Sequence, residues 1–180
     1  MNKQGNTYTF LYSVVLVVVV AALLSIVSLS LQPRQNENRE NEKRQNILSA
    51  IHVSSTAANS AELFGKYIKE QFIINAKGEK VEGNAFNVNI EKQYKLPVEE
   101  RELPVFVAEV DGATKYILPM YGAGLWGPIW GYISLDDNKD SIYGTFFDHQ
   151  GETPGLGAEI TTPKFNQAFQ QKQIFPATNW

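Results

Sequence analysis

The sequence predicts an α+β protein, in which a single N-terminal transmembrane helix is followed by an antiparallel-sheet domain with flanking helices. The first observation behind this prediction is an uncharged apolar run over residues 10–31. The second is a pair of strand-like segments on either side of Asp111-Gly112, with a further pair around residues 136–139. Helical patterns occur only outside these segments, which separates the helices from the sheet.

The composition excludes several classes of function. The chain has 180 residues, a formal net charge of −3 and no cysteine. Without cysteine it forms no disulfide, uses no thiolate nucleophile and ligates no iron–sulfur cluster. Basic residues cluster only in a short stretch after the apolar run, so no nucleic-acid partner is expected. The length allows one domain of ordinary size and an appendage.

The apolar run Phe10–Leu31 is interpreted as an uncleaved membrane anchor. Its 22 residues carry no charge, and a helix of that length spans about 33 Å, enough for a hydrocarbon core of ~30 Å. A cleaved signal peptide is the main alternative, but its apolar part normally has about 7–15 residues and ends at a small-x-small site. Ser28-Leu29-Ser30 matches such a site poorly. A buried helix of a soluble protein is the remaining alternative.

Basic residues around the anchor predict one orientation. Lys3 precedes it, whereas Arg34, Arg39, Lys43 and Arg44 follow it. Counting Lys and Arg alone places the domain after the anchor on the cytoplasmic side.

Four parts are predicted along the chain. They are an N-terminal tail (1–9), the transmembrane anchor (10–31), a polar juxtamembrane linker (32–46) and the domain (47–180). The linker is expected to become helical only towards Asn46–Ile51.

Two short helices are predicted on either side of the sheet segments. Ser60 is a good N-cap, and the helix that it begins runs to Ile68. Thr162 followed by Pro163 starts the second helix. The apolar face of the first consists of Leu63, Phe64, Tyr67 and Ile68, and the inner face of the second of Phe165, Ala168 and Phe169. The remaining predicted segments are a strand over 71–76, a loop over 84–97 and strands over 104–110, 115–120, 126–135 and 141–148.

Two glycine-rich segments form the candidate ligand site. Gly151–Gly157 contains three glycines, a proline and a threonine in seven residues, so it cannot lie inside a helix or strand. Its bare backbone lets a ligand approach the main chain closely. Earlier in the chain, Tyr121–Tyr132 places four aromatic residues among four glycines, enough to wall a flat ring system. Composition alone favours a simpler interpretation, a pair of glycine-rich turns beside an aromatic core.

Particular residues in both segments resemble a known family. Glu152-Thr153-Pro154-Gly155-Leu156-Gly157, preceded by Tyr121-Gly122-Ala123-Gly124-Leu125-Trp126, resembles the FMN-binding domain of the C subunit of the Na⁺-translocating NADH:quinone reductase. The related G subunit of the Rnf complex shares the Glu-Thr-Pro-Gly-Leu-Gly motif, but the Gly-Leu-Trp element fits the quinone reductase better. The resemblance runs from the anchor to about Phe175, and two matched motifs make it specific.

The resemblance implies a flavin-carrying electron-transfer subunit. Such a subunit relays electrons from NADH oxidation towards quinone (ubiquinone) reduction coupled to sodium export, and the chain alone would have no complete activity. The implied cofactor is FMN, and the implied partners are the other membrane subunits of the complex, the lipid bilayer and a flavin transferase. The implied location is the bacterial inner (cytoplasmic) membrane, with a single-pass anchor and the domain on the periplasmic or extracytoplasmic side. This is the side opposite to the one that the basic residues around the anchor predict.

The cofactor-binding residues carried over by the resemblance all lie in the two motifs. They are Gly124, Leu125, Trp126, Glu152, Thr153, Pro154, Gly155, Leu156 and Gly157.

Three functions stay open at this point. The first is the electron-transfer subunit, with a G-type subunit of an Rnf complex as its variant. The second is a membrane-anchored FMN-binding or sensory module without electron relay. The third is a structural envelope protein whose aromatic and glycine-rich loops are core, which a flavin spectrum would eliminate.

Asp111-Gly112-Ala113-Thr114 spells the motif in which the family attaches FMN to a threonine through a phosphoester. In the family, however, that threonine lies downstream of the Glu-Thr-Pro-Gly-Leu-Gly loop and is followed two residues later by Ser or Thr, whereas Tyr116 stands here. Asp-Gly between alternating segments is typical of a hairpin. We therefore interpret the motif as a turn and expect the chain, which ends at Pro176–Trp180, to stop before its attachment site.

No metal or hydrolytic site is predicted. The two histidines, His52 and His149, are far apart in the sequence and lack metal-ligand spacing. His149 is interpreted as a satisfied turn histidine, the alternative being a ligand contact. Glu152 and Glu159 could form an acid/base pair, but Glu152 is better explained as a brace that accepts backbone N–H groups. No nucleophile–base arrangement is visible.

Overall fold

The computed structural model describes residues 5–175. They form two compact units, one up to Glu40 and one from Asn41 onward. Residues 1–4 of the predicted tail (1–9) and the chain end at 176–180 lie outside the described residues, and residues 6–9 of the tail already belong to a helix.

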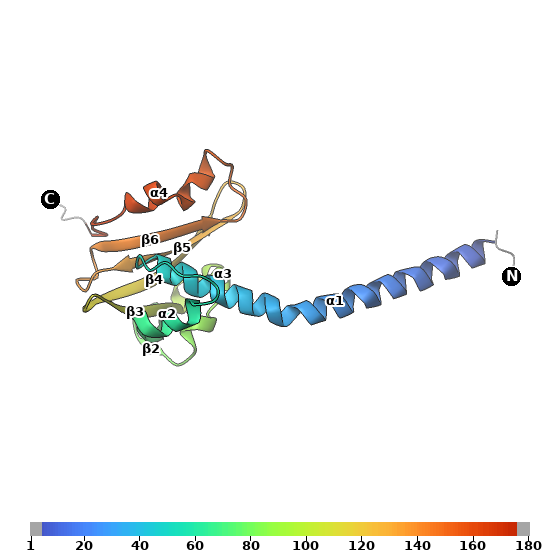
Figure 1. The fold of residues 1–180 in the computed structure, drawn as a ribbon, viewed down its shortest axis with the longest axis horizontal. Coiled ribbons are helices and arrows are strands. Elements are labelled where there is room, and N and C mark those ends of the chain that lie inside the picture. Colours follow the sequence, from blue (N-terminus) through green and yellow to red (C-terminus); the bar gives the residue numbers. More distant parts are fainter. Residues whose placement is uncertain (1–4, 176–180) are drawn as a thin grey trace. The chain divides into compact units, whose positions relative to one another are not determined.

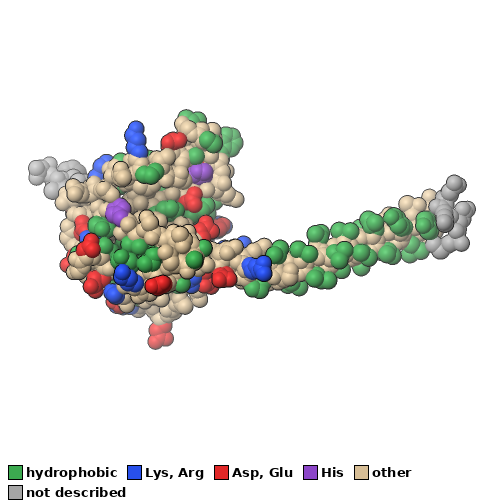
Figure 2. Space-filling view, in the orientation of Figure 1, with side chains coloured by type: hydrophobic (Ala, Val, Ile, Leu, Met, Phe, Trp, Pro, Cys, Tyr) green, Lys and Arg blue, Asp and Glu red, His purple; other side chains and the backbone are tan. Residues whose placement is uncertain are grey.

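The first unit is helical. Helix α1 (Asn6–Ser49) has 44 residues and begins in this unit. By length and composition it is apolar enough to cross a membrane, and its large apolar side chains from Phe10 to Leu31 are exposed. Hydrophobic side chains cover this stretch in Figure 2. The long apolar helix expected at residues 10–31 is therefore present.

The predicted juxtamembrane linker at 32–46 differs from the structure. Helix α1 continues through Pro33 and ends at Ser49, although a proline inside a helix removes one hydrogen bond and costs about 3 kcal/mol. The residues that follow it are mostly Gln, Arg, Glu and Lys, which are good helix formers. The second compact unit begins at Asn41 rather than at residue 47.

The second unit is built on one antiparallel sheet of six strands in the order β2-β1-β3-β4-β5-β6 (Figure 1). The strands are β1 (Ile68–Ile74), β2 (Lys80–Val81), β3 (Leu103–Val110), β4 (Ala113–Ala123), β5 (Pro128–Leu135) and β6 (Ile142–His149). Both predicted hairpins are present, as β3–β4 and β5–β6. The predicted fold class is confirmed.

Short helices lie before, between and after the strands. They are α2 (Ser60–Tyr67), η1 (Ala85–Asn87), α3 (Ile90–Tyr94), η2 (Val98–Glu100), η3 (Gly157–Thr161) and α4 (Pro163–Gln167). Asn59 rather than Ser60 is the N-cap of α2, and Ile68 already belongs to β1. The predicted loop at 84–97 contains η1 and α3, because the side chains of Asn84 and Asn89 cap them by accepting backbone N–H groups.

The core lies between one sheet face and the C-terminal end of α1. Ile47 and Leu48 on α1 and Ile51 in the turn after it are fully buried with Phe106 on β3 and Ile117 on β4. Burial of each aliphatic side chain contributes about 1.5–3 kcal/mol. Ser134 on β5 donates its hydroxyl to the carbonyl of Ala50 at 2.5 Å, which satisfies a carbonyl at the helix end. The sheet therefore holds this part of α1 firmly.

Helix α4 lies beside β6 (Figure 1). Phe165 and Phe169 contact Phe147 on β6, with ring centroids 5.8 and 5.5 Å apart. These two residues form the inner face as predicted. Ala168 does not, because α4 ends at Gln167 and the exposed Ala168 is its C-cap.

The outer edge of β6 is covered by the chain that follows α4. Ile142 donates its N–H to Lys172 O, and Gln171 donates its N–H to Ile142 O, both at 2.8 Å. Ser141 and Gln173 form a single bridge beside them. The strand at the opposite edge of the sheet, β2, is only two residues long.

Candidate functional site

The first candidate loop, Gly124–Gly127, joins β4 to β5. It is tight, since Ala123 and Pro128 pair across its base and Gly124 donates its N–H to Gly127 O at 2.8 Å. Leu125 and Trp126 occupy its tip with 82% and 68% of their surface exposed. Two large apolar side chains therefore project from the end of the sheet.

The second candidate loop, residues 150–157, leaves β6 at the same end of the sheet. His149 pairs with Ile129 near the start of β5, and Gln150 donates its N–H to Pro128 O at 3.0 Å. Antiparallel pairing brings the end of β4, the start of β5 and the end of β6 to one end. Both predicted motifs meet there because of strand register.

Glu152 joins the two loops. Its Oε1 accepts the backbone N–H of Trp126 at 3.0 Å. Its carboxylate lies against Gly124 and Gly157, where a Cβ atom at either glycine would collide with it. Glu152 was expected to brace its own loop, and the structure shows it bracing the other one. Glycine at 124 and 157 provides the space for this carboxylate.

The interior of the second loop is a compact turn. Thr153 O accepts the N–H groups of Leu156 and Ala158, both at 3.1 Å, and Gly155 has a φ of 75°. That conformation strains residues with a side chain. Leu156 projects from the turn with 73% of its surface exposed, so it is a third apolar side chain at the same end of the sheet.

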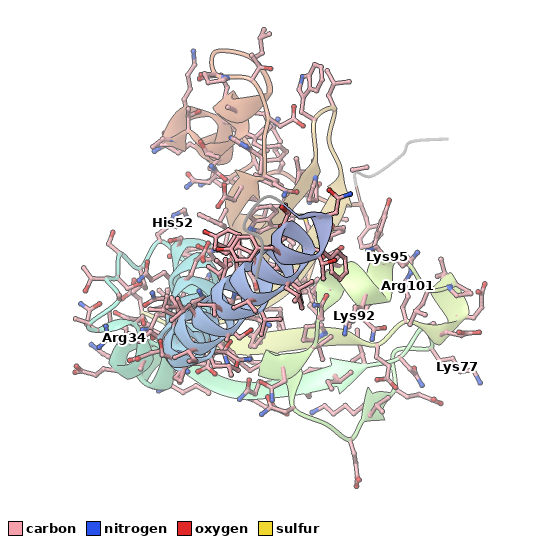
Figure 3. All side chains as sticks on the ribbon, turned by 90° about the vertical axis from the view of Figure 1, so that its right-hand side faces the viewer. Arg34, His52, Lys77, Lys92, Lys95 and Arg101 are labelled. Atoms are coloured by element: carbon pink, nitrogen blue, oxygen red, sulfur yellow. The ribbon has the colours of Figure 1, made fainter. Side chains whose placement is uncertain are left out.

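His149 has a hydrogen-bond partner, as expected of a satisfied histidine, but it is the last residue of β6 and does not lie in a turn. Its Nδ1 accepts the backbone N–H of Glu152 at 3.2 Å. The other histidine, His52, lies at the end of α1 (Figure 3), where its Nε2 is 3.1 Å from Tyr143 O and 3.0 Å from Gln170 Nε2. The sequence did not indicate that His149 contacts Glu152, because this contact depends on how the loop folds.

A shallow cavity lies beneath the two loops. It has a volume of about 140 Å³ and is lined by Met120, Tyr121, Gly122, Ile129, Trp130 and Phe147. A larger cleft of about 340 Å³ shares Met120, Tyr121 and Trp130 with it and extends to Lys43. Burial lowers the pKa of Lys43, whose Nζ donates to Phe86 O and Val88 O. Met120, Ile129 and Phe147 were not identified as site residues from the sequence.

The residues at this end of the sheet suit the ring of a flavin better than its phosphate. Leu125, Trp126 and Leu156 offer exposed apolar surface beside glycine-rich backbone, which fits a planar aromatic ring. Neither 121–132 nor 148–162 contains a Lys or Arg, whereas Asp148, Glu152 and Glu159 carry carboxylates. A phosphate dianion would find no cation in these loops.

Thr114 does not belong to this site. Asp111 and Gly112 have φ values of 51° and 76°, as a type I′ hairpin turn requires, and Thr114 pairs with Glu109 just after it. The candidate loops follow the opposite end of β4. Ten residues of extended strand at ~3.3 Å each separate them by roughly 33 Å. The interpretation of Asp111–Thr114 as a turn is confirmed.

Comparison with known proteins identifies the class. The family described as FMN-binding domain matches residues 124–178, a segment that begins in the first candidate loop and includes the second. The fold and the site therefore define an FMN-binding domain that follows one candidate membrane helix.

Full-length relatives identify the family. The C subunit of the Na⁺-translocating NADH-quinone reductase of Haemophilus ducreyi is 27% identical over 99% of this chain and 76% of its own length. The crystal structure of the same protein from Parabacteroides distasonis is 50% identical, covers 81% of this chain and 71% of that chain, and has a TM-score of 0.76. The NqrC structure from Shewanella oneidensis, 24% identical with a TM-score of 0.66 over 78% of this chain and 73% of that chain, supports the fold. The chain belongs to the NqrC family, the C subunits of Na⁺-translocating NADH-quinone reductases.

Proposed function

We propose that this chain is the flavin-carrying, electron-relaying subunit of a membrane Na⁺-translocating NADH:quinone oxidoreductase. In this role it passes electrons from NADH oxidation towards quinone reduction, and the whole complex couples that transfer to sodium export. The chain contributes a flavin site and an anchor rather than a complete activity. Its partners are the other membrane subunits of the complex.

The observation that carries the proposal is the hydrogen bond from Trp126 N–H to Glu152 Oε1. This bond joins the two motif loops into one unit with three exposed apolar side chains, Leu125, Trp126 and Leu156. FMN, when bound, supplies the electron-transfer chemistry, and the protein supplies binding, orientation and electrostatics. We assign ring binding to Gly124–Trp126 and Glu152–Gly157.

The lack of Lys and Arg in the two loop segments supports attachment of the phosphate elsewhere. A covalent phosphoester to a threonine, made by a flavin transferase, would hold the phosphate without a basic pocket. Thr114 is a poor acceptor for this role, since it lies at the far end of β4 from the loops.

A binding experiment tests the ring site. Gly155→Val in the full chain should weaken FMN binding by about tenfold or more, because valine strains a backbone with positive φ. Gly78→Val is the matched control, since Gly78 has a φ of 79° and no atom near its added Cβ, as at Gly155. FMN binding is measured by quenching of tryptophan fluorescence in detergent. Unchanged binding by Gly155→Val would refute the site but leave the family assignment intact.

A second experiment tests the electron relay. The full chain, coexpressed with its partner subunits, should show a flavin absorbance change on addition of NADH. Flavin that binds but stays oxidised in the assembled complex would favour an FMN-binding module without relay.

We also propose that the anchor lies in a bacterial inner membrane and the domain on its extracytoplasmic side. Cysteine labelling tests this location. The chain has no cysteine, so Lys77→Cys introduces a unique thiol at an exposed turn. A membrane-impermeant maleimide that crosses only the outer membrane should label it in whole cells. Labelling only after lysis would place the domain in the cytoplasm, as the basic residues after the anchor suggest.

A further inference from the structure

We propose that His149 is the positioning residue of this site: its neutral imidazole fixes the second loop so that Glu152 can reach the first. The inference rests on the proposed function only in taking these loops as the flavin site. The contacts that support it are hydrogen bonds within this chain, and its test needs neither flavin nor a partner subunit.

The backbone of His149 is held by the sheet. His149 is the last residue of β6 and pairs with Ile129 on β5. Its own N–H donates to Asp148 Oδ1 at 2.7 Å, and the residue is half-buried. The imidazole therefore projects from a fixed point at the start of the loop.

Two consecutive hydrogen bonds connect this fixed point to the tip of the first loop. Nδ1 of His149 accepts the N–H of Glu152 at 3.2 Å. The carboxylate of Glu152 then accepts the N–H of Trp126 at 3.0 Å. Because the bond to His149 is made by the Glu152 backbone, it sets where the Glu152 side chain starts. Release of the first contact thereby loosens the second.

The chemistry requires one protonation state. An imidazole nitrogen accepts a hydrogen bond only while it carries no proton, so Nδ1 is an acceptor in the neutral tautomer with the proton on Nε2. Protonation places a donor opposite the Glu152 N–H and replaces attraction with repulsion. Charged residues on the flanking segments are Asp148 on β6, Glu152 in the loop, Glu159 in η3 and Lys164 in α4; His149 pairs on β5 with the uncharged Ile129.

Amide hydrogen exchange of the full chain in detergent micelles tests the proposal without flavin. His149→Ala should speed exchange at the Glu152 and Trp126 amides by roughly 3- to 10-fold, the effect of losing one hydrogen bond. His149→Asn is the conservative variant, since Oδ1 of asparagine occupies the same place along the side chain as Nδ1 of histidine. It should keep both amides protected. Strand amides such as that of Ile133 should exchange equally in all three proteins.

Unchanged exchange in His149→Ala, equal loosening in both variants, or loosening of the strand amides as well would each overturn the proposal.

Discussion

The space at Gly157 is expected to determine whether Glu152 can join the two loops. A Cβ at this position would lie 2.5 Å from Oε2 and 3.1 Å from Cβ of Glu152. The backbone here is not in the left-handed region, so Gly157→Ala changes space more than backbone strain. The carboxylate must then move and give up the Trp126 N–H.

The expected loss of stability in Gly157→Ala follows from the hydrogen bond between Trp126 N–H and Glu152 that breaks. A hydrogen bond to a charged group contributes roughly 1.5–3 kcal/mol. Because Glu152 is half-buried and Trp126 is exposed, solvent screens this one, and we expect Gly157→Ala to lower the free energy of unfolding by about 1–2 kcal/mol. Gly65→Ala is the control: it lies in α2 with no atom near the added Cβ, and it should stabilise the protein by up to about 1 kcal/mol.

A double-mutant cycle identifies the cause. Urea unfolding of the full chain in detergent, followed by near-ultraviolet circular dichroism, gives the free energy for Gly157→Ala, Glu152→Ala and the double variant. If the added methyl acts by displacing Glu152, it should cost less than about 0.5 kcal/mol once Glu152 is already alanine. The same loss in both backgrounds would refute the reasoning.

Three further predictions concern the anchor, the turn and the core. The mature protein should retain residues 1–31, and an N-terminus near residue 30 in intact-mass spectrometry would contradict the anchor interpretation. The 180-residue chain, coexpressed with a flavin transferase on the correct side of the membrane, should give no fluorescent band on a denaturing gel; a band that Thr114→Ala removes would make Thr114 the acceptor. Phe106→Ala should lower the free energy of unfolding by about 3–5 kcal/mol in urea titrations, because Phe106 is fully buried at the centre of the core; a loss below about 1 kcal/mol would show that the core does not depend on it.

Local chemistry explains the parts of the fold that the sequence predicted. The β3–β4 turn depends on Asp111 and Gly112 alone: glycine has no Cβ atom, and aspartate is one of the few other residues that adopt a positive φ readily. Thr162 and Pro163 likewise define the start of α4 within two residues. In each case the structural preference is a property of adjacent residues, so no tertiary contact is needed to predict it.

The parts of the structure that differ from the sequence-based predictions depend on contacts between residues far apart in the chain or on side-chain caps. Pro33 suggested a break, but α1 continues to Ile47 and Leu48, which the sheet buries. Residues 84–97 have no helical pattern long enough to detect, and side-chain caps at Asn84 and Asn89 fix two short turns there. In the site, both motifs were recognisable, but the contacts of Glu152 with the other loop and with His149 depend on register across three strands.

Protection of the sheet edges bears on how the protein behaves when many copies share a membrane. Unpaired strand edges can join edge to edge into aggregates, and short or covered edges prevent this. Here β2 offers two residues, and the segment around Gln171–Gln173 bonds to the outer edge of β6. A chain cut after residue 170 would keep the candidate site but lose the β6 cover. Such a chain should cluster in the bilayer, where diffusion in two dimensions makes encounters between anchored neighbours frequent.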